Sequence, residues 1–154
     1  MRKNRERRWI NTAKSIIESI REFLLKCPYL DKLSRINVDF LPENPDTYSI
    51  ERVPAPEIVK TYLDGSSERQ VLFVFASRLF YSEELRNNID NSGFYEAFSE
   101  WLEQMSEEGK MPDLGSGKTA SKVEALSSGY LFGIADDFST ARYQIQCKLT
   151  YEKE

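Results

Sequence analysis

The stretch Gly115–Thr119 carries the residues with the most direct chemical meaning, because Gly-Lys-Thr ends the phosphate-binding loop of many nucleotide-binding proteins. That motif needs another glycine five residues before Gly117, where this chain has Pro112. It must also follow a buried strand, whereas this stretch follows a predicted helix over 94–107. We therefore predict a flexible loop over 111–122 and no phosphate site.

Enzyme chemistry is not expected from the remaining residues. The chain has no histidine, which removes the commonest general base, metal ligand and partner of a nucleophile. The pairs Glu83-Glu84, Glu107-Glu108 and Asp136-Asp137 lack the apolar pocket that would tune a catalytic acid, and the last lacks the ligand spacing of a calcium loop. Cys27 and Cys147 lack a metal-binding spacing and are predicted to be two buried thiols in a reducing compartment. We predict no catalytic residue, cofactor or metal.

Length and composition indicate one soluble globular domain. The chain has 154 residues, of which 40% are hydrophobic and 30% charged, with seven glycines and six prolines. This balance excludes collagen, low-complexity disorder and a disulfide-stapled miniprotein. No apolar run approaches the roughly 18 residues of a membrane span, and no signal-type segment marks the chain for export. We expect no membrane contact.

Charge divides the chain into a basic N-terminal extension, residues 1–8, and a single domain, residues 9–154. The extension holds five of the 21 basic residues and one of the 25 acidic residues, so the domain carries a net charge of −8. Such a domain repels phosphate, and we expect no specific binding of nucleic acid. A solvated terminus is the favoured interpretation of the extension, and contact with an acidic protein neighbour is the alternative.

Two helical segments are predicted. From Trp9 to Leu24 apolar residues recur at steps of three and four, which describes an amphipathic helix that packs on a sheet and is stopped by Pro28. Ser82 can cap a second helix, which we expect to break at 91–93, resume at Phe94 and end at Gly109.

Strand-forming runs surround these helices. They lie at 36–41, 48–53, 58–63, 70–81, 123–134 and 141–152. The last run alternates strictly between apolar and polar residues, which is typical of a strand with one core face and one wet face. The order α-β-β-β-β-α-β-β predicts an α+β fold with two main helices and an antiparallel-dominated or mixed sheet.

The run 70–81 is apolar on both of its faces. Val71, Phe73 and Phe75 alternate with Leu72, Val74 and Phe80. A strand of this kind lies between two layers or has one face covered by another subunit, because large exposed apolar patches are uncommon on monomers. This run is the strongest indication of assembly that composition provides.

Seven short strings, in order along the chain, resemble a family of small structural proteins. They are Cys27-Pro28-Tyr29-Leu30, Tyr48-Ser49-Ile50-Glu51, Asp64-Gly65-Ser66-Ser67, Phe73-Val74-Phe75-Ala76-Ser77-Arg78, Asn91-Ser92-Gly93-Phe94-Tyr95-Glu96, Ser128-Gly129-Tyr130-Leu131-Phe132 and Ala141-Arg142-Tyr143-Gln144-Ile145-Gln146. The family is found in the tail gene clusters of phages, prophages and phage-tail-like bacteriocins of Gram-positive bacteria. The resemblance runs from Cys27 to Tyr151, nearly the whole chain.

What the resemblance implies is a tail-terminator or tail-completion protein. Such a subunit forms a ring, usually a hexamer, that caps the head-proximal end of the tail tube. The implied partners are copies of the chain itself, the tail tube protein, and sheath, neck, collar or connector proteins. The implied location is the neck end of a virion or phage-tail-like particle that is assembled in the bacterial cytoplasm.

A ring needs apolar surface beyond one monomer's core, and a flexible loop can order on meeting a partner. The predicted interface residues are Val71, Phe73, Phe75, Phe80, Leu114, Lys118, Arg142, Gln144, Gln146 and Lys148. The last four form the polar stripe of the final strand, which we expect to face solvent or the ring lumen.

Two other function classes stay open from the residues. A head-side neck adaptor that contacts portal and DNA would use the basic residues of the extension and would bind with salt-dependent affinity. A small-ligand enzyme without histidine would need a deep apolar pocket with a few convergent polar groups.

Overall fold

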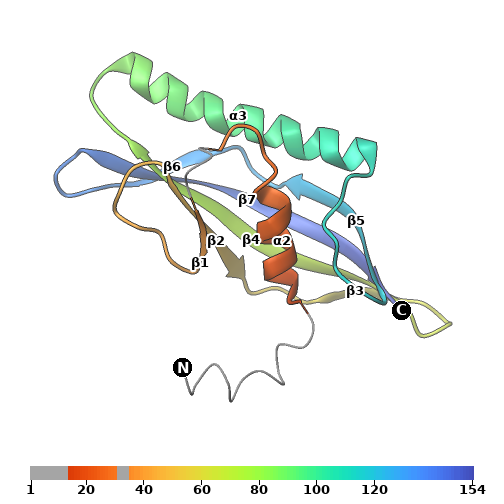
Figure 1. Ribbon diagram of the computed structural model, residues 1–154. Coiled ribbons are helices and arrows are strands. Elements are labelled where there is room, and N and C mark those ends of the chain that lie inside the picture. Colours follow the sequence, from red (N-terminus) through yellow and green to blue (C-terminus); the bar gives the residue numbers. More distant parts are fainter. Residues whose placement is uncertain (1–13, 31–34) are drawn as a thin grey trace.

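The computed structural model describes residues 14–30 and 35–154 (Figure 1). The basic extension and positions 9–13 of the first predicted helix lie outside these residues. The elements in order are α2 (Ile16–Leu24), β1 (Ile36–Val38), β2 (Thr47–Val53), β3 (Ile58–Thr61), β4 (Ser67–Phe80), α3 (Leu85–Glu108), β5 (Lys118–Ala125), β6 (Tyr130–Ile134) and β7 (Thr140–Lys153).

The strands form one seven-stranded mixed sheet. Its order is β1-β2-β4-β7-β5, with β3 beside β4 and β6 beside β7. β1 pairs with β2 in parallel, and every other pair is antiparallel. The predicted α+β fold with an antiparallel-dominated sheet is confirmed.

The centre of the sheet is the ladder between β4 and β7. It runs from the Ser67–Lys153 pair to the Phe80–Thr140 pair, and both strands have 14 residues. At about 3.4 Å per residue the ladder is roughly 45 Å long. Figure 1 shows that the β3–β4 hairpin and the β6–β7 hairpin lie at its two opposite ends.

The region after α3 differs from the prediction. The predicted strand 123–134 is two strands, β5 and β6, which pair with different parts of β7 on either side of a short connection. β5 also begins at Lys118, inside the predicted loop 111–122, because Lys118 pairs with Lys153 near the end of β7. A long-range partner strand thus overrides the weak local preference of these residues.

The helices also differ in their bounds. Within the described part of the first predicted helix, α2 begins at Ile16, because Ser15 is extended and its side chain caps the helix by accepting from the Glu18 amide at 3.2 Å. The predicted break at 91–93 is wrong, since α3 is continuous for 24 residues. Asn91 stays helical because its side chain is buried and donates to the Phe80 carbonyl at 2.7 Å.

The N-terminal end of the second helix differs from the prediction. It begins at Leu85 rather than next to Ser82, whose hydroxyl accepts a hydrogen bond from the Glu84 amide just before the helix. Its other end is as predicted, because Gly109 adopts the left-handed conformation with φ 70°.

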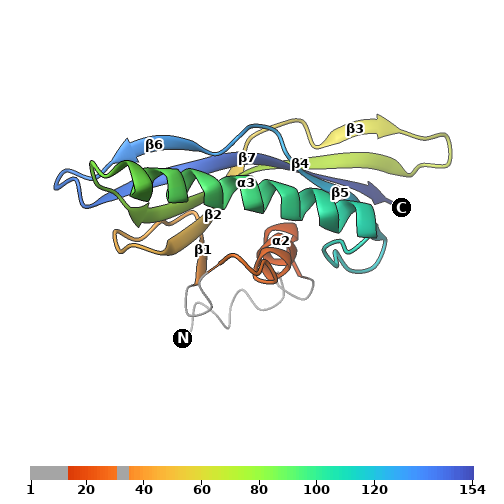
Figure 2. The ribbon, with the colours of Figure 1, turned by 90° about the horizontal axis from the view of Figure 1, so that it is seen from above.

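Both helices cover the same face of the sheet, as Figure 2 shows. Ring contacts join the helices to the sheet: Phe98 of α3 stacks on Phe75 of β4 with centroids 4.7 Å apart, and Tyr95 of α3 stacks on Tyr143 of β7 at 6.3 Å. Phe23 of α2 and Trp101 of α3, with centroids 5.0 Å apart, join the two helices to each other. We call the sheet face beneath the helices the inner face. The opposite face, which carries Val74, Ala76 and Arg78 of β4 and the even-numbered residues of β7, is the outer face.

Cys27 and Cys147 are both buried and free, which confirms the prediction of two buried thiols. Burial raises the pKa of each thiol, and for Cys147 it is the sole cause. Thiols held in the protonated form are poor nucleophiles. These cysteines therefore belong to the core.

Candidate functional site

The outer face of the sheet gathers the polar stripe that the sequence predicts on the last strand. Arg142, Gln144, Gln146 and Lys148 alternate with the apolar residues of β7 and point away from the helices. Gln146 is exposed, Arg142 and Lys148 are half-buried, and Gln144 is buried. None of the four lies between the sheet and a helix, so the stripe is the polar part of the outer face.

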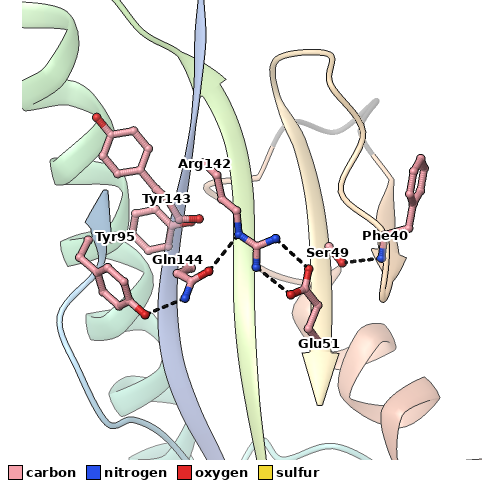
Figure 3. A network of polar contacts seen from close by, with 8 residues as sticks. Phe40, Ser49, Glu51, Tyr95, Arg142, Tyr143 and Gln144 are labelled. Atoms are coloured by element: carbon pink, nitrogen blue, oxygen red, sulfur yellow. Dashed lines mark hydrogen bonds and ion pairs between the residues drawn. The ribbon is translucent and has the colours of Figure 1, made fainter. Parts of the chain in front are cut away.

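Arg142 is anchored across the sheet by Glu51 of β2. Its Nη1 donates to Oε2 of Glu51 at 3.1 Å and its Nη2 donates to Oε1 at 2.7 Å, so the pair is bidentate (Figure 3). The two side chains are 19% and 29% exposed. Because β4 lies between β2 and β7, this ion pair joins β2 to β7 across β4.

Gln144 and β6 hold the same guanidinium from the other side. Nε of Arg142 donates to Oε1 of Gln144 at 2.9 Å, and Nε2 of Gln144 donates to the Tyr130 hydroxyl at 2.6 Å. The ring of Phe132 lies 5.0 Å from the Arg142 guanidinium carbon, within the range of a cation–π contact. The network fixes β2, β7 and β6 relative to one another and leaves Arg142 few free donors.

Three large aromatic side chains of this part of the protein are exposed to solvent. Phe132 is 61% exposed, Phe80 at the end of β4 is 57% exposed, and Phe40 is 60% exposed. The Phe40 amide donates to the buried Ser49 hydroxyl at 3.2 Å, which holds the chain after β1 against the outer face (Figure 3). These exposed rings are available for contact with another protein.

The other predicted interface residues are not brought to this face. Val71, Phe73 and Phe75 are 0–1% exposed and lie in the inner-face core, so a single chain already covers them. Leu114 is 5% exposed and packs into the same core from the loop after α3. Lys118 is half-buried at the start of β5.

Sequence reasoning missed the residues that complete the network, namely Glu51, Tyr130 and Phe132, and it also missed the exposed Phe40. Glu51 and Arg142 are 91 positions apart, and only the strand order makes them neighbours. A weak indication that β6 matters was present in the sequence, because Phe132 lies in one of the short strings that carry the family resemblance.

Two further sets of polar groups lie in the core and at the start of β5. Burial is the main reason that the pKa of Tyr95 is raised, and its hydroxyl is used within the core, 2.5 Å from the Ser77 hydroxyl and donating to the Tyr143 carbonyl at 2.9 Å. Gly115–Thr119 runs into β5 and not into a helix, which removes the helix N-terminus that a phosphate loop requires. Among residues 14–30 and 35–154 there is no cluster of three potential metal ligands.

The described surface has open hollows whose linings mix polar and apolar groups. One of about 350 Å³ lies between α3 and β5 and includes Glu103, Glu107, Lys122 and Glu124. The part of the chain that the structure describes contains no helix long and apolar enough to cross a membrane.

No family model matches the chain, and no curated protein matches it either.

Proposed function

We propose that the chain is a structural protein of a phage or phage-tail-like particle. Copies of it close into a ring, most simply of six subunits, on the head-proximal end of the tail tube. The ring joins the tube to the neck or collar, and it needs no catalytic residue or cofactor. The family resemblance over Cys27–Tyr151 supplies the location, and the α+β fold is compatible with it.

The observation that carries the proposal is the amount of apolar surface that one copy leaves in water. At the hairpin ends Leu63 is fully exposed and Phe138 is 68% exposed, while Leu85 at the start of α3 is 75% exposed. A closed ring covers such surface by joining two different patches of neighbouring copies. Burial of apolar area yields roughly 25 cal/mol per Å², so these groups favour association.

Charge supports a conduit rather than a protein that holds DNA. Residues 9–154 carry a net charge of −8, and the two arginines of the outer face are engaged, Arg142 with Glu51 and Arg78 with the Pro42 carbonyl at 3.2 Å. A ring of subunits with this net charge repels DNA phosphates.

Electron microscopy of tail tubes tests the proposal. Tube subunits of the parent particle are assembled with and without the purified chain, and the chain carries a gold label. The proposal predicts a label at one end of each tube. Label along the whole tube, or none, contradicts it. Retention of DNA on a filter, lost as salt is raised, would instead favour the neck adaptor.

A further inference from the structure

Two edge strands of the sheet carry apolar patches that differ in sequence and lie diagonally opposite. The β3 patch consists of Ile58, Val59 and Leu63, which are 51%, 52% and 109% exposed. The β6 patch consists of Leu131, Phe132, Ile134 and Phe138, which are 43%, 61%, 39% and 68% exposed. Both are too exposed to serve the core of their own chain.

Each patch lies on a strand with a free side. β3 pairs with β4 and β6 pairs with β7, and within the described residues no other strand pairs with either. One edge of each strand therefore presents unpaired backbone groups beside apolar side chains. Soluble proteins usually protect such edges with charge. β6 (YLFGI) contains no charged residue, and Lys60, the one charge of β3, lies 5.3 Å from the Tyr62 ring.

The positions of the two strands suit a head-to-tail contact. β3 pairs with Ser67–Arg69 at one end of β4. β6 pairs with β7 at residues whose β4 partners are Ala76–Leu79, at the other end and on the other side of the central ladder. A two-fold dimer joins a patch to itself, whereas a ring joins two different patches on opposite sides of each subunit.

The strand directions are also compatible. β3 is antiparallel to β4, β4 to β7 and β7 to β6, so β3 and β6 run in opposite directions within one chain. In a neighbour that continues the sheet, β6 therefore meets β3 as an antiparallel partner. Because the two strands lie at opposite ends of the ladder, this pairing inclines the strands to the ring axis, as in other closed sheets.

From these observations we propose that the contact between ring neighbours is the β3 patch of one copy against the β6 patch of the next. The occupant of each patch is thus a second copy of this chain. The proposal rests on the ring assembly proposed above and specifies its interface. Backbone hydrogen bonds between the two edges join the neighbours, and the apolar side chains fill the contact.

Blocking each patch separately tests this assignment. Val59→Asp places a carboxylate in the β3 patch, and Leu131→Asp places one in the β6 patch. Either variant alone is expected to lose the ring, because an unpaired charge in the contact raises its dissociation constant about a hundredfold or more. Leu25→Asp is the matched control: Leu25 is 44% exposed but is the C-cap of α2, which covers the inner face, and this variant is expected to keep the ring.

Mixing the two variants is the decisive step. Each still has one intact patch, so an equimolar mixture is expected to give heterodimers by native mass spectrometry and nothing larger. A ring formed by either folded variant, or a mixture that stays monomeric, overturns the assignment. Thermal unfolding checks each fold, and Leu63→Asp or Phe138→Asp replaces a variant that fails. If the unmodified chain itself forms no ring, the proposed function fails first, which separates the two failures.

Discussion

Substitution of Gly129 tests how closely the start of β6 packs against α3. A Cβ added at this position would lie 2.3 Å from both Cβ and Cγ of Tyr95, far inside the usual 3.5–4.0 Å between carbon atoms. Tyr95 has little freedom to move, because it is 2% exposed and its hydroxyl contacts the Ser77 hydroxyl and the Tyr143 carbonyl. We therefore expect Gly129→Ala to push the start of β6 away from the helix.

The size of the effect follows from the cost of overpacking. Extra carbon in a packed site costs about 1–3 kcal/mol. For a chain of this length a loss of about 2 kcal/mol lowers the midpoint of thermal unfolding by roughly 4–8 °C. Differential scanning calorimetry measures this shift directly.

Gly133→Ala is the matched control within the same strand. A Cβ there meets nothing within 4 Å, and the glycine does not need a positive φ. The free energy of unfolding of the Gly133→Ala variant should stay within about 0.5 kcal/mol of the value for the unmodified chain. If Gly129→Ala melts at the unmodified temperature, the close packing of β6 against Tyr95 is refuted.

Three further changes should have measurable results. Glu51→Gln removes the carboxylate that Arg142 binds, and it should lower the free energy of unfolding in urea by about 1 kcal/mol because the pair is partly solvent-exposed. Stability should fall as the pH rises above about 8.5: burial raises the folded-state pKa of Cys27, Cys147 and Tyr95, so unfolding releases protons at alkaline pH. Both thiols should resist a thiol reagent in the native protein and react in denaturant.

Each of these results has a clear contrary outcome. Asp90→Asn breaks an exposed ion pair with Arg86 and should change stability by less than about 0.5 kcal/mol. If Asp90→Asn and Glu51→Gln lower the free energy of unfolding equally, the Arg142–Glu51 ion pair contributes no more to stability than an exposed ion pair. Stability that is flat or rising between pH 8 and 10.5, or rapid labelling of the native thiols, would contradict the burial of these groups.

Local pattern predicted the strongest elements of the fold. The strict alternation of residues 141–152 identified β7, and the apolar stripe of α3 identified the helix that covers the sheet. The break at 91–93 was predicted wrongly, because the turn-forming preference of Asn91 was judged without its buried contact to the Phe80 carbonyl. Short edge strands such as β6 carry weak local signals and are defined by their pairing.

The candidate site was predictable only in part. Alternation separates the two faces of β4, but it cannot tell which face receives the helices, so Val71, Phe73 and Phe75 were assigned to assembly although they fill the inner core. The polar residues of β7 were found because they lie on one strand. The ion pair of Arg142 with Glu51 was not, because it depends on the order of three strands that local sequence does not specify.

The mass of the purified, unmodified chain under native conditions tests the central claim most directly. Closure through two different patches predicts one discrete species that is stable on dilution to micromolar concentration, and the family resemblance sets its expected mass at about six times 17.9 kDa. A single species of 17.9 kDa that persists at high concentration would contradict the claim that copies of this chain cover their apolar edges by forming a ring.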